Sequence, residues 1–273
     1  MRYEEEPRKE PHGIWARATH MNLGHDTYNG HANRYEIGRD YLMEREDGAL
    51  VHRGGSFNYL RATTSYDGGS TKFKRYTGTL YHTWLGNKDH YLDLVGRVGK
   101  IHAKTKAYLV DGEQSKASFG TWYQQLSAEW GRRKALNEDW YFEPQVQLQY
   151  THINSKTYTT NDGITNHLDH TNSLIGRLGF RLGHHIDEDT SWYFKADILH
   201  EFAGNRSFYL TSINGLERIH YDVTNYDTWY DIGLGINSEM SHNRSIWLEV
   251  ERKFGGSYSK AWEINGGMTW RFD

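Results

Sequence analysis

The last twelve residues of the chain, WEINGGMTWRFD (262–273), decide how the rest of the sequence is interpreted. Every second residue is apolar or glycine: Trp262, Ile264, Gly266, Met268, Trp270 and Phe272. The alternate positions between them, which form the other parity of the strand, are polar apart from one glycine: Glu263, Asn265, Gly267, Thr269 and Arg271. Because successive side chains of a strand point to opposite faces, this segment is predicted to be a strand with one apolar and one polar face.

The composition fits many such strands. The 273 residues include 28 glycines, only three prolines and 15% aromatic residues, which favours strands joined by glycine turns. The net charge of −3 and the lack of a basic block give no reason to expect a nucleic-acid partner. The absence of cysteine excludes disulfides, thiol nucleophiles and thiolate metal sites.

The hydropathy of the chain is low, with a mean of −0.85. No window approaches the roughly 20 apolar residues that a membrane helix needs. A membrane barrel, however, carries apolar residues only at alternate positions, so its mean hydropathy is low as well. The opening MRYEEEPRKEP lacks the apolar core of a secretory signal, so an exported protein with this sequence would be a mature fragment.

The two-residue alternation recurs along the whole chain, for example in YLDLVGRVG (91–99), FEPQVQLQY (142–150), LIGRLGFRL (174–182) and TWYDIGLGI (228–236). It predicts about twelve strands, near 13–22, 33–43, 55–66, 73–86, 89–108, 116–132, 139–155, 171–186, 190–208, 218–239, 245–255 and 260–272. Pro144 falls within a strand and predicts a bulge or a strand start, since proline removes a ladder donor.

The connections between these strands alternate in length. Four odd-numbered connections are long and polar: 22–32, 106–117, 156–171 and 207–217. The even-numbered ones, such as 86–90, 185–190 and 241–245, are mostly shorter, with 44–55 as an exception. This pattern predicts an all-β fold, a transmembrane antiparallel up-and-down barrel with both termini on the periplasmic side. We expect one domain, 13–273, after a polar lead, 1–12.

A soluble barrel or sandwich would also alternate, with its apolar face inward. Two features favour the membrane. About twelve strands enclose a lumen wider than side chains can fill, so inward apolar residues would pack badly. The polar parity also contains glycines that a solvent face has little reason to hold: Gly99, Gly179, Gly183, Gly233, Gly235 and Gly267. Inside a closed wall, they would leave room for aromatic or arginine side chains.

Aromatic residues gather at strand ends, as in the interfacial girdles of membrane barrels. The predicted interfacial aromatics are Trp84, Tyr91, Trp130, Trp140, Tyr141, Trp192, Trp247 and Trp270. Charged residues fall on the polar parity and are predicted to line the lumen as Arg–carboxylate pairs: Arg17, Glu36, Asp93, Arg97, Glu143, Arg177, Arg181, Asp197 and Glu263. They could set conductance or hold a linker helix, but structural pairing alone is the simpler interpretation of each residue.

Three segments together resemble the translocator barrel of monomeric autotransporters, the β-domain of type V secretion. Residues 13–41 are similar to its opening hairpin, with a Gly-x-Trp-x-Arg strand and then Tyr-x-x-Gly. Residues 76–100 resemble its central hairpin, and 265–272 resemble its closing strand. The resemblance implies a monomeric outer-membrane anchor of a Gram-negative bacterium that exports an N-terminal passenger, driven by passenger folding outside and by the assembly machinery.

The closing strand also resembles the signal that outer-membrane proteins present to the barrel-assembly machinery, carried here by Gly267, Trp270 and Phe272. Asp273 departs from the family, which usually ends on the aromatic residue. In relatives, a helix ahead of the first strand crosses the pore and joins the passenger. The lead contains Pro7 and Pro11 and is too short to cross, so most of this linker is expected to be absent. It contains no Asn, so cleavage at an Asn pair is not carried over.

Sixteen histidines raise the question of a metal or catalytic site. His12, His20, His25, His31, His167, His170, His184 and His185 lie in predicted loops, turns or the opening hairpin without regular ligand spacing. Asp169, His170 and Asp222 could belong to a hydrolase rim, although proximity in sequence is not catalytic geometry. We therefore predict no metal, no cofactor and no catalytic residue.

The sequence thus favours a translocator that meets outer-membrane lipid, the barrel-assembly machinery, and its own passenger and linker. A free-standing porin is the alternative, and a soluble carbohydrate-binding β-barrel is the third possibility.

Overall fold

The structure is a computed structural model that describes residues 12–45, 48–86, 89–109, 111–213, 215 and 217–272. Residues 1–11 of the predicted lead and Asp273 lie outside these ranges. The described part is built from strands and contains no helix able to span a membrane, a finding that does not bear on β-barrels.

Twelve long strands make the wall in the described part of the chain: β1 (His12–Asn22), β2 (Asn29–Glu44), β3 (Leu50–Tyr66), β4 (Gly69–Leu85), β5 (His90–Tyr108), β6 (Gln114–Arg132), β8 (Trp140–Ile153), β11 (Thr171–His185), β12 (Thr190–Glu201), β15 (Thr228–Ser241), β16 (Arg244–Gly255) and β17 (Tyr258–Phe272). Each pairs antiparallel with its neighbours. β1 pairs β17 from His12↔Phe272 to Asn22↔Trp262, and β8 pairs β11, so the ring closes. The predicted twelve-stranded barrel is confirmed.

Burial alternates along each strand of this wall. On β15, Trp229, Asp231, Gly233, Gly235 and Asn237 are buried, and the residues between them, Tyr230, Ile232, Leu234 and Ile236, are exposed. Buried residues across the wall are mostly polar or charged, and exposed ones include most large apolar side chains. In a closed wall the buried side is the inside, so the polar side chains point inward and the apolar ones outward.

The inward face is filled near the termini by aromatic rings that lie on glycines of the adjacent strand. A Cβ on Gly38 would lie 2.3 Å from the ring of Trp15, and one on Gly235 would lie 2.1 Å from the ring of Tyr193. The same contact joins Gly54 to Tyr81, Gly131 to Tyr91 and Gly183 to Tyr141. Glycine therefore supplies the space that an inward ring needs, as in designed barrels where an aromatic covers a strand glycine.

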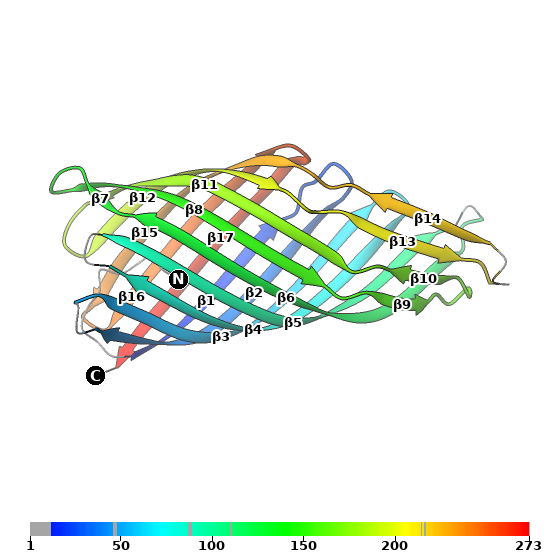
Figure 1. Cartoon of the computed structure of the whole chain (residues 1–273), viewed down its shortest axis with the longest axis horizontal. Helices are drawn as coiled ribbons and strands as arrows, with labels where there is room; N and C mark the ends of the chain where they lie inside the picture. Colours follow the sequence, from blue (N-terminus) through cyan, green and yellow to red (C-terminus); the bar gives the residue numbers. More distant parts are fainter. Residues whose placement is uncertain are drawn as a thin grey trace.

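The two ends of the barrel differ. The end that carries His12 and Phe272 has short connections, such as those between β4 and β5 and between β15 and β16. At the other end, β9 (Lys156–Thr159), β10 (Thr165–Leu168), β13 (Arg206–Thr211) and β14 (Arg218–Val223) form a separate sheet in the order β14-β13-β10-β9. Figure 1 shows this sheet projecting from the end of the barrel opposite the C-terminus.

This sheet corrects the predicted connections. Residues 156–171 and 207–217 were predicted as loops, yet each contains strand, because their polar backbone groups pair with one another beyond the wall. The predicted strands 190–208 and 218–239 are each interrupted, after Glu201 and after Val223. The predicted long connection 44–55 is short, because β3 already begins at Leu50.

Pro144 lies inside β8, opposite Phe180 of β11, without a register shift. A bulge in β8 or a start at Pro144 is therefore wrong. The irregularity lies in the neighbouring strand, because β8 pairs β6 only up to Gly131↔Gln145 and then pairs the two-residue β7 (Lys134–Ala135). Pro144 thus falls where the partner changes and where a missing N–H donor costs least.

Candidate functional site

The candidate site is the polar inner face of the barrel. Charged side chains are seldom fully buried unless they are paired. Here Arg181 and Glu143 are among the most buried side chains of the described residues, at 1% and 2% exposed. The inner face must therefore satisfy its charges by contacts within the wall.

Arg177 is the most connected of these charges. Its guanidinium lies 2.8 Å from a carboxylate oxygen of Glu129 on β6 and 2.6 Å from one of Asp197 on β12. It also donates hydrogen bonds of 3.1 Å to Gln145 and Gln147 on β8. One side chain on β11 thus binds groups from three neighbouring strands, as the planar guanidinium with five donors allows.

Glu143 lies beside this group at the end that carries the termini. Arg133 donates to its carboxylate at 2.8 Å, and Gln145 donates at 2.6 Å. The hydroxyl of Tyr91 reaches both Glu129, at 3.1 Å, and Glu143, at 3.3 Å. Glu129 and Glu143 therefore share the Tyr91 hydroxyl, whereas each has its own cation: Arg177 for Glu129 and Arg133 for Glu143.

Lys195 organises a second group farther around the wall. Its ammonium lies 2.6 Å from Glu251 and 3.4 Å from Glu249, both on β16. Tyr193 donates to Glu249 at 2.6 Å. Lys195 crosses β15 at Gly233, where an added Cβ would lie 2.8 Å from the lysine Cε. The glycine is what allows a side chain of β12 to reach β16.

A third group spans the seam where the chain closes. Arg17 on β1 forms an ion pair with Glu36 on β2, and Ser56 on β3 donates to the same carboxylate at 2.6 Å. Arg34 lies 3.5 Å from Glu263 on β17 and donates to Thr19 at 3.0 Å. These contacts tie the first three strands to the last one.

The structure places all nine predicted lumen charges on the buried parity, and none is exposed. It brings together Arg17 with Glu36, and Arg177 with Asp197. The others contact different partners: Arg97 donates to Gln125 at 2.8 Å, Asp93 accepts from Thr83 at 2.5 Å, and Arg181 lies over the Tyr193 ring at 4.2 Å. That these residues line an open passage stays a prediction.

Several charges of these groups were missed: Arg34, Glu129, Arg133, Lys195, Glu249 and Glu251. The alternation could have found most of them. In IWLEVERKF (246–254), Glu249 and Glu251 share a parity opposite Leu248 and Val250. The six inner-parity glycines were predicted to make room for aromatic or arginine side chains. Four meet rings, whereas Gly179 meets Asp197 and Gly233 meets Lys195.

The predicted interfacial aromatics need a correction. Tyr91 and Tyr141 are each only 4% exposed and point inward, so they cannot reach the membrane interface. Trp247 also points inward, with its ring 2.6 Å from where a Cβ of Gly267 would lie. The remaining five, Trp84, Trp130, Trp140, Trp192 and Trp270, are on the outward parity. Trp140 and Trp192 contact each other edge to face at 5.6 Å.

The proposed assembly residues lie in the closing strand. Trp270 and Phe272 point outward and pair with Ile14 and His12 of β1, and Gly267 lies on the inward parity under Trp247. The ring of Phe272 stacks on that of His12 at 6.1 Å.

The histidines do not gather into a ligand set: the described residues include no group of three or more His, Cys, Asp or Glu that could hold a metal. Asp169 contacts His167 at 3.2 Å, whereas His170 stacks on His152. Asp222 accepts from Ser207 at 2.6 Å and lies 3.1 Å from His220. In a Ser-His-Asp triad the histidine lies between the other two, whereas here the aspartate does.

Comparisons with known proteins agree with this architecture. The family model Autotransporter beta-domain matches residues 12–251. The pertactin autotransporter of Bordetella parapertussis is 26% identical over 242 residues, which cover 86% of this chain and 25% of that protein. The serine protease EspC of Escherichia coli O127:H6 is 28% identical over 280 residues, or 95% of this chain and 20% of that protein. The chain thus spans a fifth to a quarter of the length of these two curated relatives.

Two solved structures share the fold. The β domain of the Bordetella autotransporter BrkA has a TM-score of 0.78 at 22% identity and covers 96% of this chain and 100% of its own. The translocator domain of NalP from Neisseria meningitidis also has a TM-score of 0.78, at 13% identity, covering 98% of this chain and 90% of its own.

Proposed function

The chain belongs to the autotransporter β-domain family, whose members are outer-membrane barrels of Gram-negative bacteria, and from that premise we propose that it anchors and exports a passenger domain. The passenger would be attached ahead of residue 1. The observation that carries the proposal is a closed wall with an apolar outer face and a polar inner face that pairs several of its charges.

This arrangement suits passage of an unfolded chain. Backbone N–H and C=O groups cannot enter hydrocarbon without a cost of several kcal/mol each, so an extended segment needs a polar route. Twelve strands enclose more space than the eight whose side chains just fill a barrel. Several of the wall's own charges are neutralised by pairs such as Arg177 with Asp197, so there a passing segment would meet dipoles and paired ions. Such a surface would offer little to hold the segment tightly.

The remaining roles follow from the same orientation. We place residues 13–273 in the barrel domain, the termini on the periplasmic side, and the β9–β10 and β13–β14 hairpins outside the cell, because long connections lie outside in such barrels. The nine inward charges listed above would line the passage, and Trp84, Trp130, Trp140, Trp192 and Trp270 would meet the membrane interface. Gly267, Trp270 and Phe272 would present the closing strand to the assembly machinery. The barrel would be a monomer and have no bond chemistry of its own.

Export can be tested by surface display. A secretory signal and a small folded reporter are placed ahead of residue 1, and protease is added to intact cells. We expect the reporter to be cleaved in intact cells while a periplasmic marker survives. A matched fusion to a Leu234→Arg variant, with a charge in the apolar outer face, should fail to insert and leave the reporter protected.

Two outcomes would contradict the proposal. A reporter that stays protected while the barrel resists extraction from the membrane would indicate a channel without export, the porin alternative. A chain that folds cooperatively without detergent or lipid would contradict the membrane assignment itself.

A further inference from the structure

A group of cations lies outside the barrel, on the wall formed by β3 to β6 at the end opposite the termini. Its members share the outward parity and are all exposed: Arg61, Lys72, Lys74, Lys100, Lys104, Lys106 and Lys116. We name these seven residues the outer basic patch. The inward neighbours Ala62 and Ala103 are buried at 6% and 1% exposure, which confirms the direction of the patch.

The register places like charges directly opposite one another in this patch. Lys72 pairs with Lys104 across β4 and β5, Lys106 pairs with Lys116 across β5 and β6, and Arg61 pairs with Lys74 across β3 and β4. Like charges directly opposite on a sheet destabilise it. A wall that repeats this arrangement three times is expected to have an anionic partner.

That anion is not supplied by the wall itself. The outward positions of β3 to β6 contain no Asp or Glu, and the nearby acids lie in the connections, at Asp67, Asp111 and Glu113. Among the described residues, no member of the patch makes an ion pair; Lys100 instead lies over the ring of Trp122 at 5.8 Å. The patch is thus positive and open to an external ligand.

The depth of the patch follows from the row of residues at its edge, which includes one member of the patch, Lys100. Tyr59, Tyr76, Lys100 and Trp122 are cross-strand neighbours on the outward face, and such rings mark the membrane interface. Lys72 and Lys104 lie four residues beyond that row, or about 13 Å along the strand and about 10 Å along a tilted barrel axis. This is the level of lipid headgroups.

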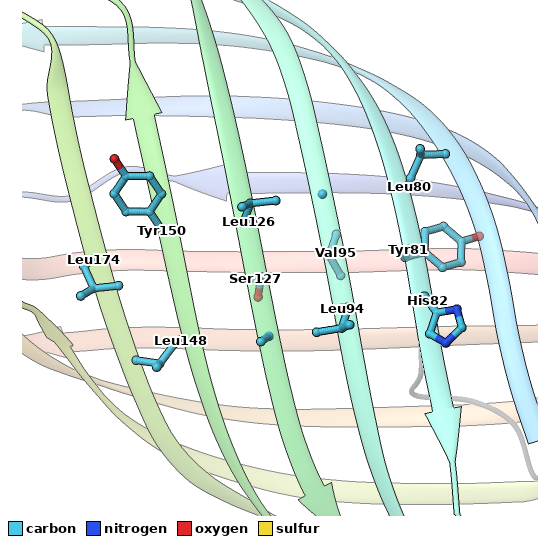
Figure 2. Close-up of a pocket in the computed structure, with 12 residues that line it drawn as sticks. Leu80, Tyr81, His82, Leu94, Val95, Leu126, Ser127, Leu148, Tyr150 and Leu174 are labelled. Carbon is cyan, nitrogen blue, oxygen red and sulfur yellow. The ribbon is translucent and has the colours of Figure 1, made fainter. Parts of the chain in front are cut away.

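An apolar groove lies on the other side of the same row. It has a volume of about 530 Å³ and is bordered by Leu80, Leu94, Leu126, Leu148 and Leu174 on five neighbouring strands, as Figure 2 shows. The small residues Gly96 and Ala128 also line it. A second depression, lined by Ile37, Phe57 and Val98, adjoins it at Leu80 and Leu126. Small residues on a lipid-facing wall leave room for an acyl chain to lie close to the backbone.

We propose that this wall binds a phosphorylated glycolipid of the outer leaflet, with its phosphates on the outer basic patch and an acyl chain in the groove. Lysine and arginine bind phosphate oxygens by charge-assisted hydrogen bonds, and clusters of them recognise anionic headgroups. The site rests on the proposed function only for its orientation, which directs the patch to the outer leaflet.

The test is native mass spectrometry of the whole barrel in a neutral detergent, titrated with bisphosphorylated lipid A, with its dephosphorylated form and with inorganic phosphate. The variant Lys72→Gln/Lys104→Gln/Lys106→Gln removes three charges of the patch. Its matched control, Arg39→Gln/Arg53→Gln/Arg132→Gln, removes three outward cations at the other end. We expect lipid A to bind the wild type and the control at least tenfold more tightly than it binds the lysine variant, and the difference to shrink in high salt.

Three outcomes would overturn the proposal: equal binding by the lysine variant and the control, equal binding of the dephosphorylated lipid, or binding of inorganic phosphate as tight as that of lipid A. The lysines are exposed, so their substitution should not unfold the barrel. If the triple variant nevertheless misfolds, the single variant Lys104→Gln replaces it, and we expect it to lose part of the affinity for lipid A. Because the isolated barrel is titrated, failure of export leaves this result intact, and failure of lipid binding leaves export intact.

Discussion

Cations inside the barrel and cations of the outer basic patch differ in the partners that they contact. Arg177 and Lys195 each contact two carboxylates on other strands. Lys72 and Lys104, on the outward face, are opposite each other and have no carboxylate partner in the described residues. At these two groups the inner wall pairs its own charges, whereas the outer basic patch leaves its charges for the surroundings.

The difference agrees with the functions proposed above for the two faces. A passage through which a chain slides would hold that chain less tightly where the wall's charges are paired, because a passing acidic or basic segment binds to free charges. A face that lies in a membrane can do so only at headgroup depth, where an anionic lipid completes the pairing. Removing a paired inner cation should thus harm the protein itself, and removing an outer one should change only what it binds.

The largest effect is expected for Arg177→Met. Methionine removes the guanidinium that lies 2.8 Å from Glu129 and 2.6 Å from Asp197, and breaking a buried ion pair costs about 3–5 kcal/mol. The free energy of unfolding should fall by this amount in reversible urea denaturation of the barrel in detergent micelles. Arg53→Met, which removes an exposed outward cation, is the control and should change stability by less than about 0.5 kcal/mol.

The triple variant Arg177→Met/Glu129→Gln/Asp197→Asn sharpens this test. Neutralising the two carboxylates that have lost the Arg177 guanidinium should restore part of the lost stability, since a buried charge that has lost its ion pair costs more than a neutral amide. An equal loss in both variants would mean that packing of the arginine stem, and not charge pairing, holds this part of the wall.

A smaller effect is expected for Gly235→Val. The new Cβ would lie 2.1 Å from the inward ring of Tyr193, which itself donates to Glu249. Such overpacking costs about 1–3 kcal/mol. Gly78→Val is the matched control, because a Cβ there has nothing within 4 Å and points outward. It should be neutral, or stabilising by less than about 1 kcal/mol, since valine favours strands. A control as damaging as Gly235→Val would contradict the assignment of inside and outside.

The alternation of residues was enough to predict the barrel, because the period of a strand is local and survives without knowledge of its neighbours. It also placed Arg177 and Asp197 on the inner parity. It could not show that Lys195 reaches past Gly233 to Glu251, since that contact depends on the register of three strands. Trp247 was predicted at the membrane interface because it is a tryptophan, although it shares its parity with the inward Glu249. In the structure it points inward, as that parity indicates. The predicted strand 218–239 contains β14, whose Ile219, Tyr221 and Val223 alternate with polar residues as in a wall strand. The period therefore could not show that this segment leaves the wall and pairs with β13.

Lys104→Thr should have a small effect of the opposite sign. It relieves the repulsion with Lys72, and the free energy of unfolding should rise by about 0.2–1 kcal/mol in zwitterionic lipid at low salt. In vesicles that contain phosphorylated glycolipid, the gain should vanish or reverse, because an anion then bridges the two lysines. Arg53→Thr, which has His82 and no cation across from it on β4, should show neither change. A gain that is equal in both lipids would mean that no anionic lipid reaches the patch.

The smallest effect concerns the rim, where Asp162 at the β9–β10 turn is held by hydroxyls and not by a cation. A hydrogen bond from Thr160 is the main cause that lowers the pKa of this carboxyl below its usual 3.8, and the Ser115 hydroxyl also donates at 3.1 Å. Since the folded pKa is depressed, the contribution to stability is complete above the usual pKa and is lost as the pH falls through the folded value. Amide hydrogen exchange at Gly163 and Ile164 should therefore be protected equally from pH 7 to about pH 4 and then weaken. In Asp162→Asn the protection should not depend on carboxyl titration. A loss of protection already between pH 7 and 5 in the wild type would show that a neighbouring histidine, and not this carboxylate, orders the rim.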